Sequence, residues 1–246
     1  YVAVRSTGAE HRGGELRVLG DEEPDSIDPA LAYSLTSWSI LLMTNDGLVA
    51  FRKVAGVEGT QLVPDLSVAL PSPTDGGKTY TFELRRNLTY SNGKPVRPDD
   101  FRRAIERVFE LGSITPLYAG IVGASGCRTG ARCDLARGIV ADRAARTVTF
   151  RLTTPDADFL SKLALPFAFA VPSDTGRREV ERPLPATGPY RVASYQKRAT
   201  SGSRSSSAAR RVTKGVFACR IAGGSATRVR SRSRLRSAIA PKAWFA

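Results

Sequence analysis

The fold class of this chain is decided by residues 77–109, which read GKTYTFELRRNLTYSNGKPVRPDDFRRAIERVF. In the first part of this segment apolar and polar residues alternate, which predicts a strand with one buried face. The apolar members of that strand are Tyr80, Phe82 and Leu84. A tight turn is expected at Asn92-Gly93, because this pair adopts the backbone angles of short hairpin loops.

A helix is expected from Pro98 onward. The sequence Pro98-Asp99-Asp100 is typical of a helix start, since proline fits the first turn and either aspartate can accept hydrogen bonds from the free amides there. Apolar residues then recur at helical spacing and form one stripe, which we expect to face the core. The stripe comprises Phe101, Ala104, Ile105, Val108 and Phe109.

Further strands and helices are expected on both sides of this unit. Apolar patterns and turn signals predict strands at 15–19, 48–51, 139–141, 147–152, 167–171 and 190–195. Helices are predicted within 30–46, with Thr36 or Ser37 as N-cap, and within 158–165. Strands and helices mix without strict alternation, so the sequence predicts an α+β or mixed α/β fold.

The positive charge of the chain is concentrated near its C-terminal end. The formal net charge is +14, from 37 Lys and Arg and 23 Asp and Glu, and every acidic residue lies between Glu10 and Glu181. Residues 197–246 contain 13 Lys and Arg and no acid, so they carry almost all of the excess. The preceding residues are therefore nearly neutral and have the composition of an ordinary globular protein.

Few residues of the chain support catalysis, a cofactor or a metal site. The only histidine is His11, in a polar lead-in, which argues against His-dependent triads and most histidine metal sites. The glycine-rich stretch at 120–126 lacks the Gly-Lys-Ser/Thr end of a phosphate-binding loop, and no Gly-x-Ser-x-Gly motif is present. We therefore expect a binding protein without cofactor or metal, and not an enzyme.

Seven short segments, each weak alone, occur in a fixed order along residues 13–196. They are GELRV (14–18), SIDP (26–29), LVPDL (62–66), GKTYTFELRR (77–86), YSNGKPV (90–96), PDDF (98–101) and ATGPY (186–190). Together they resemble the peptide/nickel type of bacterial solute-binding proteins, the oligopeptide- and dipeptide-binding group of ABC importers.

The resemblance implies a two-lobed receptor outside the cytoplasm that closes on its ligand. A periplasmic-binding-protein-like first lobe would consist of residues 14–50 and 183–196, with a second domain inserted at 51–182 and a flexible lead-in at 1–13. Family members are about twice as long, so the chain is expected to be a truncated form that lacks the opposite lobe. The implied partners are a small peptide or similar solute and an ABC permease in the membrane. We expect a monomer without a nucleic-acid partner. Whether a lipid anchor lies ahead of Tyr1 is left open.

The resemblance also implies which residues meet the ligand. Ligands of the family are captured through backbone groups, as an extended peptide that pairs like an added strand. The implied contacts are Tyr33, Ser34, Leu35, Trp38 and Tyr118. The first four follow the SIDP segment, and Tyr118 matches a segment whose aromatic residue approaches the ligand from the second domain. The alternative is that Leu35 and Trp38 simply pack the first-lobe helix.

Two of the three cysteines, Cys127 and Cys133, are separated by five residues with Thr129-Gly130 at the centre. The residues alone leave two readings open, a short-loop disulfide or two free thiols. The resemblance to an extracytoplasmic family favours the disulfide. Two thiolates without a nearby histidine make a poor zinc site, and Cys219 has no evident partner.

After Gln196 the resemblance ends and the composition turns to Arg, Ser and Ala. We favour the hypothesis that residues 197–246 are a frameshift product, since GC-rich DNA read out of frame yields these residue types. The alternative function is an interaction protein whose genuine basic tail binds nucleic acid or anionic surfaces in a salt-dependent way. The tail has too few large apolar residues for a core, so disorder is expected.

Overall fold

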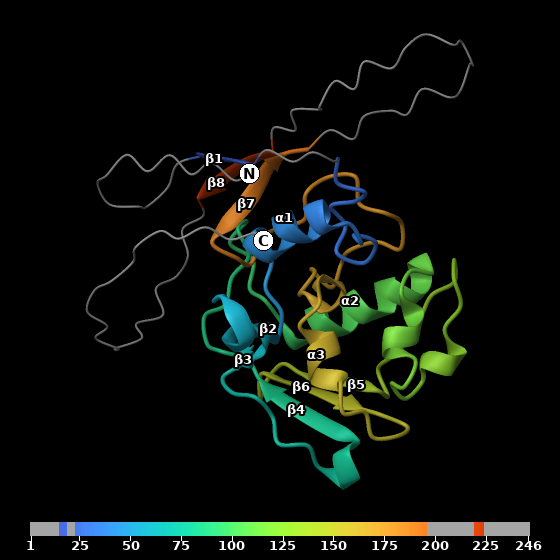
Figure 1. Ribbon diagram of the computed structural model, residues 1–246. Helices are drawn as coiled ribbons and strands as arrows, with labels where there is room; N and C mark the ends of the chain where they lie inside the picture. The colour runs from blue at the N-terminus through green and yellow to red at the C-terminus, as the bar shows by residue number, and fades with distance from the viewer. Residues whose placement is uncertain (1–14, 19–22, 196–218, 224–246) are drawn as a thin grey trace.

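The computed structural model describes residues 15–18, 23–195 and 219–223 (Figure 1). The predicted lead-in at 1–13 and all of the tail except 219–223 lie outside the described residues. The expectations for those segments, including the frameshift hypothesis, remain predictions.

The strand predicted from residues 77–109 lies in a three-stranded antiparallel sheet. Strands β4 (Thr79–Glu83), β6 (Thr147–Arg151) and β5 (Ile139–Asp142) follow each other in the order β4-β6-β5. Phe82 pairs with Val148 across the sheet, and its ring meets that of Phe150 edge-on with 5.9 Å between the ring centroids. The strands predicted around Phe82, at 139–141 and at 147–152 are therefore confirmed.

Helix α2 (Pro98–Leu111) packs on this sheet. All five residues of the predicted apolar stripe are buried. The carboxylate of Asp100 accepts a hydrogen bond of 2.8 Å from the amide of Arg97, so Asp100 closes the first turn as expected. The helix ends at Gly112, whose φ of +65° is a conformation that favours glycine.

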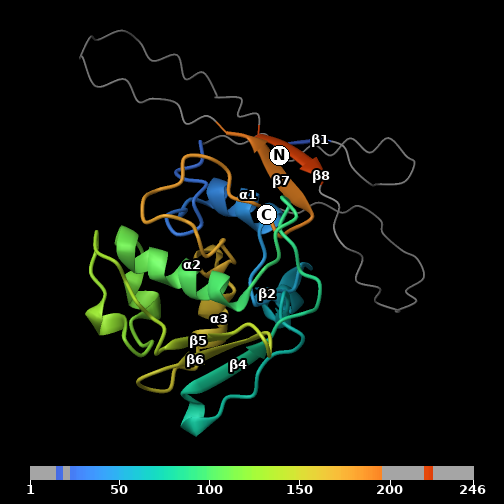
Figure 2. The same ribbon diagram turned by 180° about the vertical axis from the view of Figure 1, so that it is seen from behind.

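A second antiparallel sheet has the order β1-β8-β7. Its strands are β1 (Glu15–Val18), β8 (Cys219–Gly223) and β7 (Tyr190–Ser194). Helix α1 (Leu35–Thr44) packs against β7. Figures 1 and 2 show α1 between this sheet and α2, with the β4-β6-β5 sheet beyond α2. The predicted mixture of helix and sheet is thus arranged in layers.

Short elements complete the described part of the chain. Strands β2 (Val49–Phe51) and β3 (Leu62–Pro64) pair with each other, and α3 (Phe159–Leu163) packs near β2. The 3-10 turns are η1 (Gly56–Thr60), η2 (Asp75–Gly77), η3 (Thr115–Tyr118), η4 (Ala124–Gly126) and η5 (Pro166–Ala168). Among the described residues, no helix has the length and apolar character needed to cross a membrane.

The predicted N-cap of α1 is wrong. The cap is Ser34, whose backbone is extended and whose hydroxyl oxygen accepts a hydrogen bond of 3.2 Å from the amide of Ser37. The helix does not start earlier, because the amides of Tyr33 and Ser34 donate to the carboxylate of Asp25 and the backbone of Ser34 is extended. Residues 30–34 therefore form a loop, and the helix begins at Leu35.

The strand predicted at residues 167–171 is also wrong. These residues are buried, but Pro166 opens the turn η5 and the amide of Phe169 donates to the carbonyl oxygen of Pro166. The amide of Ala170 donates to the carbonyl oxygen of Asp46. A short apolar run indicates burial without separating a strand from a buried turn, which explains the error.

Within the basic tail, the expectation of disorder is wrong for residues 219–223. These residues form β8, which pairs with β1 on one side and with β7 on the other; Ile221 lies opposite both Leu16 and Val192. The tail as a whole is poor in large apolar residues, but residues 216–222 read VFACRIA. The average composition of the whole tail does not reveal this short apolar run. A five-residue strand forms when its backbone can hydrogen-bond to two neighbouring strands.

The chain crosses from one sheet to the other twice, and the two crossing segments lie side by side. The amides of Thr187 and Gly188 donate to the carbonyl oxygen of Thr44 at 3.1 and 2.9 Å. The amide of Asp46 donates to the hydroxyl oxygen of Thr187 at 2.7 Å. The ATGPY segment is thus used to join the layers, which explains why a threonine and a glycine stand there.

Candidate ligand-binding surface

The loop before α1 is organised by the carboxylate of Asp25. One oxygen accepts a hydrogen bond of 2.9 Å from the amide of Tyr33. The other accepts from the amide of Ser34 at 3.2 Å and from the hydroxyl of Ser37 at 2.5 Å. Partial burial acts to raise the pKa of Asp25, but these hydrogen bonds outweigh it and lower the pKa from 3.8 to about 2. Asp25 is therefore ionised at neutral pH and fixes the backbone of residues 33–34.

Two apolar side chains project from this fixed backbone into solvent. Tyr33 is 67% exposed and Leu35 is 84% exposed. Ser34, between them, is occupied as the N-cap of α1. The alternative that Leu35 packs the helix is contradicted by this exposure. Apolar groups held in water on an ordered backbone are a feature of binding surfaces.

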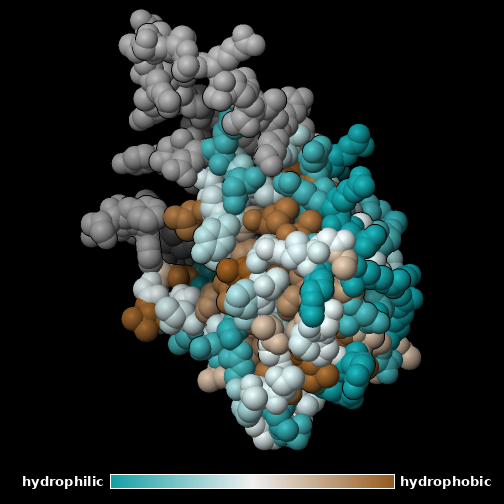
Figure 3. Space-filling model, turned by 90° about the vertical axis from the view of Figure 1, so that its right-hand side faces the viewer, coloured by the Kyte–Doolittle hydropathy of each residue, from teal (hydrophilic) through white to brown (hydrophobic). Residues whose placement is uncertain are grey.

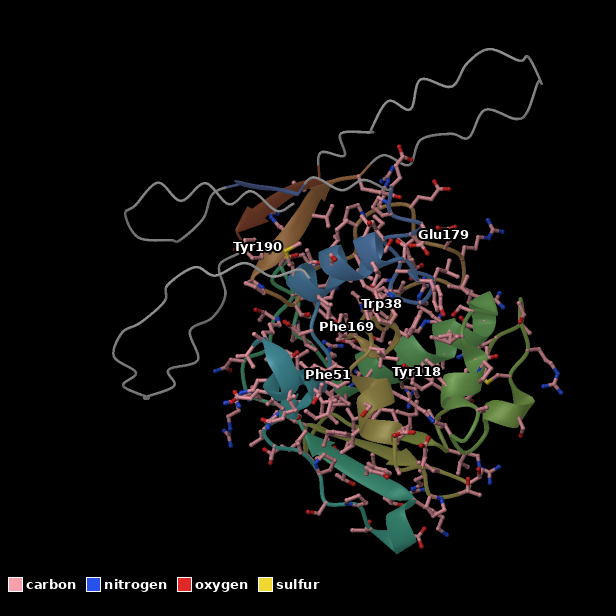
Figure 4. The ribbon with its side chains drawn as sticks, viewed as in Figure 1. Trp38, Phe51, Tyr118, Phe169, Glu179 and Tyr190 are labelled. Carbon is pink, nitrogen blue, oxygen red and sulfur yellow. A yellow bond between two sulfur atoms is a disulfide. The ribbon has the colours of Figure 1, made fainter. Side chains whose placement is uncertain are left out.

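Trp38 lies one turn along α1 and is partly buried. Its indole nitrogen donates a hydrogen bond of 2.8 Å to the carbonyl oxygen of Ala32. Its ring meets Phe167 edge-on at 5.9 Å between centroids, and Figure 4 shows it beneath α1 near Phe169. Trp38 therefore supports the loop from below, as the packing alternative expects.

The prediction that Tyr118 contacts the ligand is wrong. Tyr118 is 0% exposed, and its hydroxyl donates a hydrogen bond of 2.9 Å to the carbonyl oxygen of Lys162. Burial raises the pKa of Tyr118, because a charged phenolate would be costly in this surrounding. The segment that suggested a ligand contact carries no information about burial, and the ring belongs to the core between η3 and α3.

Cys127 and Cys133 are joined by a disulfide with an S–S distance of 1.99 Å. The loop that it closes lies against the C-terminal end of α2. The amide of Cys133 donates to the carboxylate of Glu110 at 3.1 Å, and the amide of Gly130 donates to the Glu110 carbonyl oxygen at 2.8 Å. These contacts give the disulfide loop a structural role at the end of α2.

A buried ion pair that the sequence analysis missed joins the SIDP segment to α2. The side chains of Asp28 and Arg107 are both 0% exposed, and the Arg107 guanidinium donates to Asp28 Oδ2. The amide of Val180 donates to the same oxygen at 2.9 Å. Burial raises the pKa of Asp28, while Arg107 and the amides oppose that effect. The signal that could have found the pair is a charged residue in the buried sector of a predicted helix.

The exposed apolar side chains gather on limited parts of the described surface. Figure 3 shows hydrophobic side chains at the left edge and in the middle of this face, and hydrophilic ones along its right. The large exposed apolar residues are Tyr33, Leu35, Leu42, Phe51, Val54, Val57, Val68 and Leu70. They come from the segment around α1 and from the chain around β2 and β3. The two segments are linked where the Lys53 ammonium donates to the Leu42 carbonyl oxygen at 3.5 Å.

Two open grooves of about 930 and 990 Å³ lie elsewhere and are both lined in part by Thr175, Gly176 and Arg177. The first also follows α2, where Arg103 and Glu110 form an ion pair of 2.6 Å. As formed by the described residues, neither groove is lined by any of the five predicted ligand contacts. The candidate ligand surface is therefore the exposed Tyr33–Leu35 segment.

Comparison with known proteins identifies the family. Residues 61–203 match the bacterial extracellular solute-binding proteins, family 5, middle region, and this match spans more than half of the 246 residues. The chain belongs to family 5 of the bacterial extracellular solute-binding proteins. The expected family is confirmed, and the match continues a little beyond Gln196, where we expect it to end.

Relatives support the same assignment. Protein XP55 of Streptomyces lividans is 30% identical over 202 residues, which cover 78% of this chain and 33% of that protein. The dipeptide-binding protein DppE of Bacillus subtilis (strain 168) is 32% identical over 96 residues, which cover 39% of this chain and 16% of DppE.

A solved structure confirms the periplasmic-binding-protein-like fold. The clavulanic acid biosynthesis oligopeptide binding protein 2 matches with a TM-score of 0.62 and 32% identity, over 75% of this chain and 34% of that one. This family 5 chain thus spans about one third of the length of that protein and of XP55.

Proposed function

We propose that this chain is part of a receptor that captures peptides outside the cytoplasm and delivers them to an ABC permease in the membrane. The family consists of extracellular solute-binding proteins, and two similar proteins carry the names dipeptide-binding and oligopeptide binding protein. We assign residues 14–50 and 183–196 to a first lobe and 51–182 to an inserted domain, and we expect a monomer.

The observation that carries this proposal is the exposure of Tyr33 and Leu35 on a backbone that Asp25 holds in place. Covering a leucine side chain with a ligand contributes about 1.5–3 kcal/mol. Because the loop is already ordered, little of that free energy is lost in fixing the backbone on binding. The ligand therefore lies along residues 33–35, with Trp38 supporting the loop from below.

Peptide titration calorimetry with matched variants tests the proposal. A mixture of short peptides should bind this chain weakly, with a Kd on the order of 0.1 mM, because enclosure by a facing lobe supplies much of the burial in such receptors. Leu35→Ser should weaken binding about tenfold, the loss expected for part of one buried leucine. Val57→Ser is the control, since Val57 is 85% exposed against 84% for Leu35 but lies in η1.

The outcomes separate clearly. Loss of heat for Leu35→Ser with retention for Val57→Ser supports peptide capture at residues 33–35. An absence of heat with every peptide contradicts the function, and equal losses in both variants contradict the location.

A further inference from the structure

The turn that leads into the Tyr33–Leu35 segment depends on Asp28. The carbonyl oxygen of Asp28 accepts hydrogen bonds of 2.9 Å from the amides of both Leu31 and Ala32. One oxygen of its side chain accepts from the amide of Ala30 at 3.1 Å. Asp28 therefore sets the path of residues 30–32, directly before the exposed Tyr33.

Asp28 is itself held from the opposite side by α2. Besides its bond to Asp28, the guanidinium of Arg107 donates to the carbonyl oxygen of Gly176 and, at 3.3 Å, to that of Arg178. Two residues further on, the amide of Val180 donates to Asp28. The neighbouring hydroxyl of Ser26 donates to the carboxylate of Glu179 at 3.1 Å. One arginine thus connects α2, residues 176–180 and the turn before Tyr33.

The burial of this pair makes its geometry demanding. Both side chains are 0% exposed, and Arg107 Nε has no hydrogen-bond partner among the described residues. Removing charges from water costs several kcal/mol per ion, and only good geometry offsets that cost. A lysine would carry the charge but not the planar fork that reaches a carboxylate and two carbonyl oxygens together.

We propose that Arg107 is a positioning residue for the ligand surface: through Asp28 it fixes the Tyr33–Leu35 segment. The part of this inference that concerns ligand affinity rests on the proposed function, whereas the part that concerns the order of the segment does not. Arg107 makes no contact with ligand. It acts by keeping residues 30–34 in the conformation from which Tyr33 and Leu35 project.

Hydrogen exchange on the full chain tests the inference without ligand. The variants are Arg107→Lys and the matched control Arg103→Lys, one turn earlier on the same helix. Arg103 also forms an ion pair, with Glu110 at 2.6 Å, and donates to the carbonyl oxygen of Thr175 at 2.8 Å. Exchange at the amides of residues 31–34 should rise at least tenfold in Arg107→Lys relative to the control, after normalisation to strands β4 and β6. Equal exchange in the two variants overturns the inference.

Peptide affinity supplies the second readout. Arg107→Lys should bind about tenfold more weakly than Arg103→Lys, and faster exchange with unchanged affinity overturns the role in binding. If the unaltered chain binds no peptide, the proposed function fails, while the exchange result still decides the positioning role. Should Arg107→Lys not fold, the double variant Asp28→Asn with Arg107→Gln removes both buried charges together, and the same tenfold rise in exchange is expected there.

Discussion

Replacing Gly188 by alanine should weaken the joint between the two layers of the molecule. A Cβ atom at this position would lie 2.9 Å from the carbonyl oxygen of Met43 and 2.9 Å from the carbonyl carbon of Thr44. Both are backbone atoms, so relief requires the two crossing segments to move apart. Overpacking of this kind costs about 1–3 kcal/mol. The two hydrogen bonds to the Thr44 carbonyl oxygen would also weaken, each with a net value of about 0.5–1.5 kcal/mol.

The expected loss of unfolding free energy for Gly188→Ala is therefore roughly 2–4 kcal/mol, a fall in Tm of about 5–15 °C for a chain of this size. Urea unfolding followed by circular dichroism and tryptophan fluorescence measures it. Gly120→Ala is the control, because a Cβ there meets nothing within 4 Å. That variant should be neutral or more stable by up to about 1 kcal/mol. Agreement between the two variants within about 0.5 kcal/mol would refute the argument.

Two further predictions concern individual side chains. Burial and the charge of Asp46 raise the pKa of Asp65 from 3.8 to about 6, so the stability linked to its proton is complete below pH 3.8 and is lost as the pH rises through 6. Urea unfolding from pH 4 to 7 should show the unfolding free energy of the unaltered chain falling by about 1–3 kcal/mol relative to that of Asp65→Asn. Parallel pH profiles of the two chains would contradict the raised pKa of Asp65. Tyr118→Phe should lose about 0.5–1.5 kcal/mol of unfolding free energy with its bond to Lys162, while peptide affinity stays unchanged; weaker peptide binding would return Tyr118 to the ligand site.

Local patterns of sequence predicted the local structure well. The alternation around Phe82 and the stripe on α2 depend on periodicity within one element, and the structure confirms both. The family resemblance located the exposed loop at residues 33–35, because its SIDP segment directly precedes that loop. Helix propensity failed for the residues before Leu35, because the carboxylate of Asp25, nine residues before Ser34, accepts the hydrogen bond of the Ser34 amide.

What could not be predicted depends on contacts between distant parts of the chain. Asp28 and Arg107 are 79 residues apart, and nothing local indicates that they meet. The pairing of β8 joins residues 219–223 to strands near both residue 16 and residue 192. Burial of Tyr118 likewise depends on α3 packing over it. Sequence periodicity gives the inward face of an element but not its partner.

The most direct test of the account uses a short peptide that carries a paramagnetic spin label, added to the isotopically labelled full chain. Broadening that is strongest at the backbone amide signals of residues 33–35, and weaker at the signals of η1 and of the grooves beside Gly176, is the predicted result. Broadening confined to those grooves, or none at saturating peptide, would contradict the claim that this ordered and exposed loop is where a peptide is held.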